Sequence, residues 1–272
     1  MTDTHNSSLR EGHRSAKAIL FDLDETLTVH EQAFAEAYVA TAGLAAERRA
    51  IDAAQLAASV PMLAESICQV SPAGRYAAVI GIGGRDLLWS DPDGDRPELQ
   101  RMAEWVEGFR AEVWEAVLSA HGIPDSKLAQ ELAERFPDEM RARIKVYPEA
   151  RGVLDDVKDD YEMAVVTNGL PLAQHEKLQI AGLDSYFETV VVSGELGAGK
   201  PSALMFEEAL KRLGCQPEDA VMVGDNPARD ILGANKAGIR AVWVNRFNLE
   251  MPGSLPAPDA EIADLSQLKA LL

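Results

Sequence analysis

The chain has 272 residues, of which 47% are hydrophobic and 26% are charged. This composition is typical of a globular protein, and the length allows one large core or two smaller ones. The formal net charge of −18 argues against nucleic acid as a partner, because no basic stripe is present to neutralise phosphates. The same negative field repels anionic substrates, so a phosphate site here must carry its own local positive charge.

The N-terminal residues 1–15 are polar and lack periodicity, so we expect a disordered tail there. They contain no apolar segment of the kind found in secretory signals, and no apolar run approaches the length of a membrane span. Cys68 and Cys215 lie far apart and form no metal-binding or redox pattern. They indicate buried or incidental thiols in a reducing compartment. The sequence therefore predicts a cytoplasmic protein with no membrane partner.

An apolar run predicts the first strand over residues 16–24, and this strand ends on two acids, Asp22 and Asp24. Alternate side chains of a strand share a face, so the two carboxylates repel each other unless a cation lies between them. The C-terminal edge of a parallel sheet is also where open α/β folds bind ligands. The alternative interpretation is a solvated acidic turn that follows the strand.

Between about residues 30 and 145 the pattern becomes helical, with apolar residues at helical spacing around Phe34 and Tyr38 and again over residues 105–117. An irregular stretch over residues 72–97 separates these helices. Its glycine-rich run, Gly81–Gly84, lacks a convincing preceding strand and a Lys-Ser/Thr partner, so we interpret it as a loop rather than a phosphate-binding motif. The sequence thus predicts an all-helical cap, inserted over residues 30–145.

From residue 148 onward, short apolar strands alternate with helices. Strands are expected at residues 163–166, 189–193, 220–223 and 241–245, and helices at about 148–160, 171–181, 202–213 and 227–237. This alternation predicts a parallel sheet with helices on both of its faces. A surface loop over residues 252–258 and a short terminal helix complete the chain. The α/β core would then comprise residues 16–29 and 146–272.

Three further polar motifs follow strands of this second block. The segment Thr167–Gly169 can direct a hydroxyl and successive backbone N–H groups at an anion, or it can be a plain turn. Lys200 precedes a helix start, where a cation opposes the helix dipole unless it reaches inward to negative groups; the alternative is an exposed loop lysine. Asp225 closes a strand and Asp230 lies one turn into the next helix, and N-capping explains one of these acids but not both.

These motifs follow four strands in order, and we expect all of them at one edge of one sheet. In this respect the chain resembles the haloacid dehalogenase superfamily in its phosphatase branch, and there the pyrimidine nucleotidase and N-acylneuraminate-9-phosphatase relatives. The resemblance covers residues 16–29 and about 146–248. It implies a Rossmann-like α/β core, whereas the predicted cap matches the family only in its position and its helicity.

The resemblance implies that Asp22 attacks phosphorus and forms an aspartyl-phosphate. Asp24 would protonate the leaving oxygen and then deprotonate the attacking water, a task that suits a carboxyl with a raised pKa. Mg²⁺ would be held by Asp22, the backbone carbonyl of Asp24, and Asp225, because such an all-oxygen set suits a hard cation.

The same resemblance assigns substrate binding to Thr167 and Asn168, whose hydroxyl and N–H would hold the phosphoryl oxygens. Lys200 would offset the negative charge around Asp22, and Asp230 would brace Lys200 from behind the site. Charge neutralisation of this kind is the main catalytic task in phosphoryl transfer.

The sequence therefore predicts a Mg²⁺-dependent hydrolase of a small phosphate ester, such as a nucleoside monophosphate or a sugar phosphate, in a monomer or homodimer. Asp24 favours phosphoryl chemistry, because the dehalogenating branch has no acid at this position. A phosphosugar mutase and a catalytically silent binding protein of the same fold are the alternatives. We expect hinges near residues 28–30 and 146–148. Arg75, Arg85 and Arg110 are candidates to meet the leaving group, although a solvated surface arginine is the favoured interpretation of each.

Overall fold

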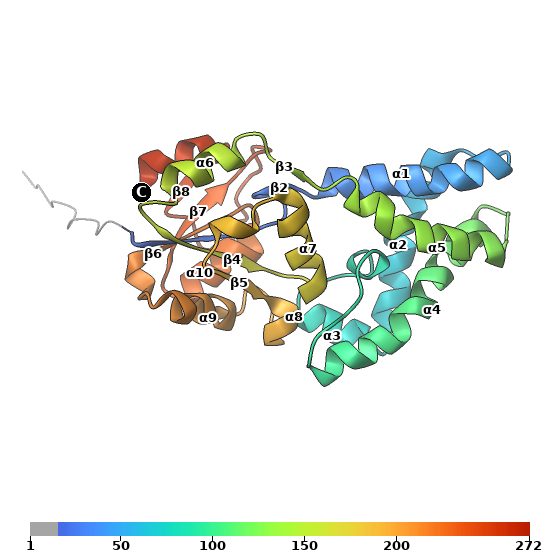
Figure 1. Ribbon diagram of the computed structural model, residues 1–272, viewed down its shortest axis with the longest axis horizontal. Helices are drawn as coiled ribbons and strands as arrows, with labels where there is room; N and C mark the ends of the chain where they lie inside the picture. The colour runs from blue at the N-terminus through green and yellow to red at the C-terminus, as the bar shows by residue number, and fades with distance from the viewer. Residues whose placement is uncertain (1–15) are drawn as a thin grey trace, which may run out of the picture.

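The computed structural model describes residues 16–272, so the tail expected over residues 1–15 lies outside the described part of the chain. An α/β part and a cluster of helices lie side by side along the long axis of the molecule (Figure 1). Two chain segments cross between them, next to the labels β2 and β3. The inserted helices therefore extend away from the sheet and do not cover one of its faces.

The α/β part is built on one six-stranded sheet with the order β5-β4-β1-β6-β7-β8, in which all neighbours are parallel. The strands are β1 (Ala18–Phe21), β4 (Glu162–Thr167), β5 (Thr189–Val192), β6 (Ala220–Gly224), β7 (Arg240–Val244) and β8 (Ala260–Ile262). The expected α/β fold with a parallel sheet is confirmed. The edge strand β8 was not expected, because its three residues are too few to show a periodic pattern.

Helices cover both faces of the sheet, which explains why β1 is apolar at every position. Ile19 and Phe21 pack into one apolar cluster, and Ala18 and Leu20 into the other. The first cluster includes residues of α6 (Ala150–Val157), α7 (Pro171–Ala181) and the terminal 3₁₀-helix η5 (Leu265–Leu271), and the second those of α9 (Ala203–Leu213) and α10 (Leu232–Lys236).

The helix expected over residues 227–237 starts as a π-helix, η4 (Pro227–Ile231), and continues as α10. The Asn226 side chain caps its N-terminus by accepting hydrogen bonds from the backbone N–H groups of Ala228 and Arg229. Since Asn226 satisfies the helix end, Asp225 is not needed as the cap. A four-residue helix after β5, α8 (Ser193–Leu196), was not expected.

The helical insertion consists of α1 (Glu31–Arg48), α2 (Ala53–Val70), α3 (Gly74–Val79), the 3₁₀-helix η1 (Asp86–Leu88), α4 (Pro97–Ala120) and α5 (Ser126–Arg141). It has an apolar core of its own, in which Phe34, Tyr38 and Phe136 stack against one another. The run Gly81–Gly84 lies between α3 and η1 and is a loop, as expected.

A two-stranded antiparallel ribbon of β2 (Thr28–Val29) and β3 (Lys145–Val146) joins the insertion to the α/β part. Cys68 is buried and Cys215 is half-buried, and both are free thiols. Among the helices of residues 16–272, none combines the length and the apolar character that a bilayer crossing requires.

Candidate active site

A cavity of about 380 Å³ lies between the C-terminal edge of the sheet and the helical insertion. Polar side chains from both sides line it. The α/β part contributes Asp22, Asp24, Thr167, Asn168, Lys200 and Asp225, and the insertion contributes Glu31, Glu65, Gly81, Arg85 and Asp86. Of the α/β residues that the sequence placed in the site, Asp230 is not part of this lining. The four strand-end motifs thus converge at one edge of the sheet.

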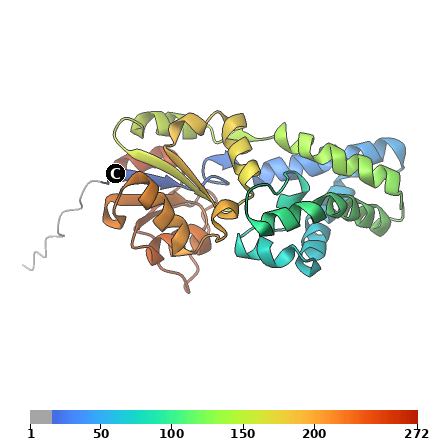
Figure 2. The same cartoon turned by 60° about the horizontal axis from the view of Figure 1, so that its bottom comes forward.

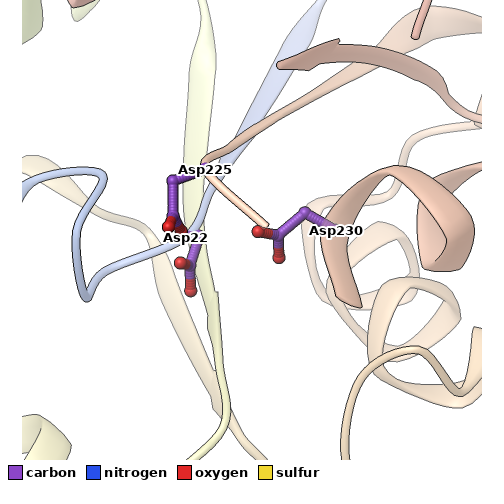
Figure 3. Close-up of side chains that lie close together, drawn as sticks. All are labelled: Asp22, Asp225 and Asp230. Atoms are coloured by element: carbon purple, nitrogen blue, oxygen red, sulfur yellow. The ribbon is translucent and has the colours of Figure 1, made fainter. Parts of the chain in front are cut away.

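Three carboxylates meet at the base of the cavity. Asp22, Asp225 and Asp230 each offer one oxygen atom within 4.8 Å of the others. Asp22 and Asp225 lie next to each other because β1 and β6 are adjacent parallel strands that end together, and Asp230 approaches from the opposite side (Figure 3). Such an all-oxygen group is the kind of site that holds a hard divalent cation.

Lys200 is the cation built into this acidic group. Its ammonium donates to Asp22 Oδ1 over 2.5 Å and to Asp230 Oδ1 over 2.6 Å, and its side chain is only 2% exposed. Asp230 Oδ2 accepts from the backbone N–H of Asn226. The Lys200 ammonium therefore points into the acidic group, and Asp230 holds it there through a hydrogen bond.

The carboxylates outnumber the cation, and burial makes the imbalance costly. Burial, opposed by Lys200 and reinforced by Asp230, raises the pKa of Asp22 to about 6. Burial and the charges of Asp22 and Asp230 raise the pKa of Asp225 to about 9. With all three acids ionised, one ammonium leaves roughly two negative charges unbalanced. These residues therefore fit a divalent cation, which would supply the charge that the site lacks.

Asp24 belongs to a separate ion pair. Its carboxylate accepts from Lys177 over 2.7 and 2.8 Å, from Gln174 over 3.2 Å and from Thr28 over 3.3 Å. Burial opposes ionisation, but His30, Lys177 and the hydrogen bonds from Lys177 and Gln174 outweigh it and hold the pKa of Asp24 below its usual range. His30 lies 3.3 Å away, but burial lowers its pKa to about 3, so Lys177 is the balancing cation at neutral pH. The expectation that Asp24 has a raised pKa is wrong for this structure.

Three residues around Asp24 were not expected from the sequence: Gln174, Lys177 and His30. Gln174 and Lys177 lie three residues apart on the buried face of α7, where Leu178 packs into the core. Two polar residues on an otherwise apolar helix face were the available signal, because such residues are buried only when they have partners. His30 precedes α1 and belongs to no recognisable pattern.

Hydrogen bonds join the end of β4 to α7 and to the loop that carries Lys200. The hydroxyl oxygen of Thr167 accepts from the Gln174 side chain. Asn168 Oδ1 accepts from the backbone N–H of Lys200 over 2.7 Å, and its Nδ2 donates to the Lys200 carbonyl over 3.2 Å. Asn168 thus fixes the loop that carries the catalytic lysine candidate.

The opposite wall of the cavity comes from the insertion. Arg85 pairs with Glu31 over 2.7 Å and lies over the Phe34 ring. Glu65 accepts from the N–H of Gly84 and Asp86 from that of Gly83, so two acids hold the glycine-rich loop in place. This wall presents both charge signs toward the space above Asp22.

Of the three arginines named as candidates for the leaving group, only Arg85 lines the cavity. Arg110 pairs with Asp91 over 2.8 Å and donates to the Leu87 carbonyl, which braces the segment between η1 and α4. Arg75 is exposed on α3. Only Arg85 is therefore placed to contact a leaving group. The sequence could not distinguish the three arginines, because their positions relative to the cavity depend on the fold.

A parallel α/β sheet with Asp22, Asp225 and Lys200 at its C-terminal edge defines a hydrolase of the dehalogenase–phosphatase type. The model of one protein family, the haloacid dehalogenase-like hydrolases, matches residues 16–238. The chain therefore belongs to the haloacid dehalogenase-like hydrolase family, and within it to the phosphatases.

Two relatives and one solved structure illustrate the similarity. Phosphoserine phosphatase of Thermus thermophilus is 38% identical over 93% of this chain and 97% of that protein. Human N-acylneuraminate-9-phosphatase is 31% identical over 61% of this chain and 68% of its own length. The crystal structure of 2-haloacid dehalogenase from Pseudomonas syringae pv. Tomato matches with a TM-score of 0.63 and 27% identity, covering 94% of this chain and 97% of that one. The resemblance inferred from the motifs is confirmed.

Proposed function

We propose that the chain is a Mg²⁺-dependent phosphomonoester hydrolase that works through an aspartyl-phosphate at Asp22. The contact of Asp22 with Lys200 at the base of the cavity carries this proposal. An ionised carboxylate is already nucleophilic, and Lys200 restrains it while limiting the repulsion of an incoming phosphate.

In the first step a carboxylate oxygen of Asp22 bonds to phosphorus, and the bond from phosphorus to the leaving oxygen breaks. Thr167 and the N–H of Asn168 hold the phosphoryl oxygens, and Lys200 offsets their charge. Asp22, the carbonyl of Asp24 and Asp225 would hold Mg²⁺, which would supply electrostatic stabilisation. Water then attacks phosphorus, which releases phosphate and regenerates the carboxylate.

Asp24 transfers the protons in this proposal. Its lowered pKa suits the second step, where the anion accepts a proton from the attacking water. The first step needs the protonated acid instead. An incoming phosphate adds negative charge close to Asp24, which raises the pKa of Asp24. Asp24 would thus take up a proton as substrate binds.

The substrate would be a small phosphorylated metabolite. Arg85 and Glu31 face the cavity with opposite charges, and such a pair fits a leaving group that carries both a carboxylate and an ammonium. Phosphoserine has this chemistry, and the Thermus relative named for it matches nearly the full chain. We therefore favour phosphoserine over the nucleoside monophosphates and sugar phosphates expected from the motifs.

We further propose that residues 30–145 act as a cap on a core of residues 16–29 and 146–272. The ribbon of β2 and β3 is the hinge. Glu25 lies beside it and accepts from the N–H groups of His30 and Glu31 and from the Tyr147 hydroxyl. One carboxylate thus joins both crossing segments to the start of α1, where a small rotation would open the cavity.

A phosphate-release assay tests the function directly. The purified protein should hydrolyse p-nitrophenyl phosphate only with Mg²⁺, and in a panel of esters phosphoserine should have the highest kcat/KM. Transfer of phosphate to product without release would favour the mutase alternative. Absence of both activities on the whole panel would favour the silent binding protein.

A further inference from the structure

The insertion touches the catalytic loops through its own backbone. Residues 76–81, at α3 and the turn after it, form three hydrogen bonds with the α/β part. The Val79 carbonyl accepts from the N–H of Gly199 over 3.0 Å, the Ile80 carbonyl accepts from the Ser193 hydroxyl over 2.6 Å, and the Tyr76 hydroxyl donates to the Gly194 carbonyl over 3.3 Å. α3 lies against α8 in both ribbon views (Figures 1 and 2).

Glycines make this approach possible. A Cβ atom added to Gly199 would lie 2.7 Å from the carbonyl group of Ile80. A Cβ atom added to Gly81 would lie 2.1 Å from Nδ2 of Asn168. Both distances are too short for non-bonded atoms, so the insertion backbone packs directly on the loops that carry Asn168 and Lys200.

Ser193 is the point where this contact reaches the phosphate-binding segment. Its side chain is fully buried, and besides donating to Ile80 it accepts from the N–H of Gly169 over 2.9 Å. The Gly169 carbonyl lies 3.4 Å from the same hydroxyl. A serine hydroxyl has one proton to donate, and Ile80 is the closer acceptor. When the insertion moves away, that proton is left with the Gly169 carbonyl as its acceptor.

We infer that Ser193 is a positioning residue that couples docking of the insertion to the geometry of Thr167–Gly169. With the insertion docked, the Ser193 proton is held by Ile80, and a lone pair of its oxygen fixes the N–H of Gly169. The segment that binds the phosphoryl group is thereby held in its reactive position only when the cavity is closed. The assignment of phosphate binding to this segment rests on the proposed function; the coupling itself rests on the contacts.

The kinetic test compares Ser193→Ala with Tyr76→Phe on the best phosphate ester of the panel. Both variants remove one hydroxyl from the contact between the insertion and the α/β part, but only Ser193 reaches Gly169. We expect Ser193→Ala to lower kcat about tenfold with KM changed less than about twofold, as for the loss of one buried hydrogen bond in the transition state. Tyr76→Phe should keep kcat within about twofold of the wild type. Equal kcat losses in the two variants, or none in Ser193→Ala, would overturn the coupling.

Amide hydrogen exchange on the same variants tests the coupling without any activity. Ser193→Ala should speed exchange in two segments, residues 76–84 and 167–170, whereas Tyr76→Phe should do so only in residues 76–84. Unchanged exchange in residues 167–170 of Ser193→Ala contradicts the proposal. A wild-type protein that hydrolyses no ester would overturn the proposed function, and the exchange result would still decide the coupling.

Discussion

The two walls of the cavity hold their charges in opposite ways. In the α/β part, Lys200 and Asp230 have side chains that are 2% and 0% exposed, and Lys200 bonds to two carboxylates. In the insertion, Arg85 and Glu31 are 36% and 60% exposed and form a single pair. A buried lysine that is hydrogen-bonded to two carboxylates is costly to rearrange. An exposed ion pair contributes little to stability, and its partners can readily bind other charged groups instead. The difference is consistent with our proposal that the sheet carries the chemistry and that the insertion selects the substrate.

The largest effect is expected at the nucleophile. Asp22→Asn keeps the shape of the side chain but removes the charge that attacks phosphorus, so kcat should fall on the order of 10⁴-fold or more. Asp155→Asn makes the same chemical change in an exposed acid of α6 that pairs with Lys158, and it should leave kcat unchanged. Turnover by Asp22→Asn within tenfold of the wild type would remove Asp22 from the mechanism.

The second effect concerns the metal. EDTA should abolish activity and Mg²⁺ should restore it, because the buried acids outnumber Lys200. Asp225→Ala removes one of the two carboxylates proposed as ligands, so a titration should show half-maximal activity only at a much higher Mg²⁺ concentration. Ca²⁺ should inhibit, since its larger and looser shell misplaces the in-line geometry. Full activity in metal-free buffer is the contrary outcome.

A smaller effect is expected at Lys177. Lys177→Met removes a cation that helps hold the pKa of Asp24 below its usual range, so this pKa should rise. The direct measurement is NMR of the Asp24 carboxyl carbon as a function of pH, because the acid limb of the rate profile is set by the higher pKa of Asp22. Loss of the cation that holds Asp24 in place should also lower kcat about 10²-fold.

Lys177→Met should also change the stability of the protein in a pH-dependent direction. A carboxyl whose folded-state pKa is lowered stabilises the protein above its unfolded pKa, and this contribution is lost only as the pH falls through the folded value. Lys177→Met should therefore be less stable than the wild type at neutral pH, with the difference shrinking in acid. Lys158→Met, which removes an exposed lysine, is the control. A pKa of Asp24 that is unchanged in Lys177→Met would show that Lys177 does not help to set it.

The smallest effect is expected on the insertion wall. Arg85→Met and Glu31→Gln should each lower kcat/KM for phosphoserine about tenfold, while hydrolysis of acetyl phosphate stays near the wild-type rate. Arg75→Met, which changes an exposed arginine outside the cavity, should leave kcat/KM for both substrates unchanged. Equal losses on both substrates, or an unchanged ranking of the ester panel, would mean that this wall does not select the substrate.

Much of the α/β wall could be predicted because strand ends are visible in sequence. Asp22, Thr167 and Asp225 each follow an apolar run that can only be a buried strand, and parallel strands bring their ends to one edge. Lys200 and Asp230 were less visible. A lysine before a helix start opposes the helix dipole unless it reaches acids, and N-capping explains only one of Asp225 and Asp230. The structure brings these side chains together as expected, whereas their catalytic and binding roles remain predictions.

The rest could not be predicted, for identifiable physical reasons. Lys177 is buried only because α7 packs beside the end of β1, and this contact depends on tertiary arrangement. The pKa of Asp24 follows from that neighbour, so the expectation of a raised value failed with it. Ser193 acts through backbone groups of Ile80 and Gly169, which carry no side-chain signal.

The proposed function depends on covalent phosphorylation of Asp22. The direct measurement is acid quenching of the enzyme during turnover with Mg²⁺ and substrate, followed by borohydride reduction and peptide mass analysis. Reduction converts an aspartyl-phosphate into homoserine, so we expect homoserine at residue 22 in the wild type and none without substrate. Turnover with an unmodified residue 22, or with homoserine at residue 24 instead, would contradict it.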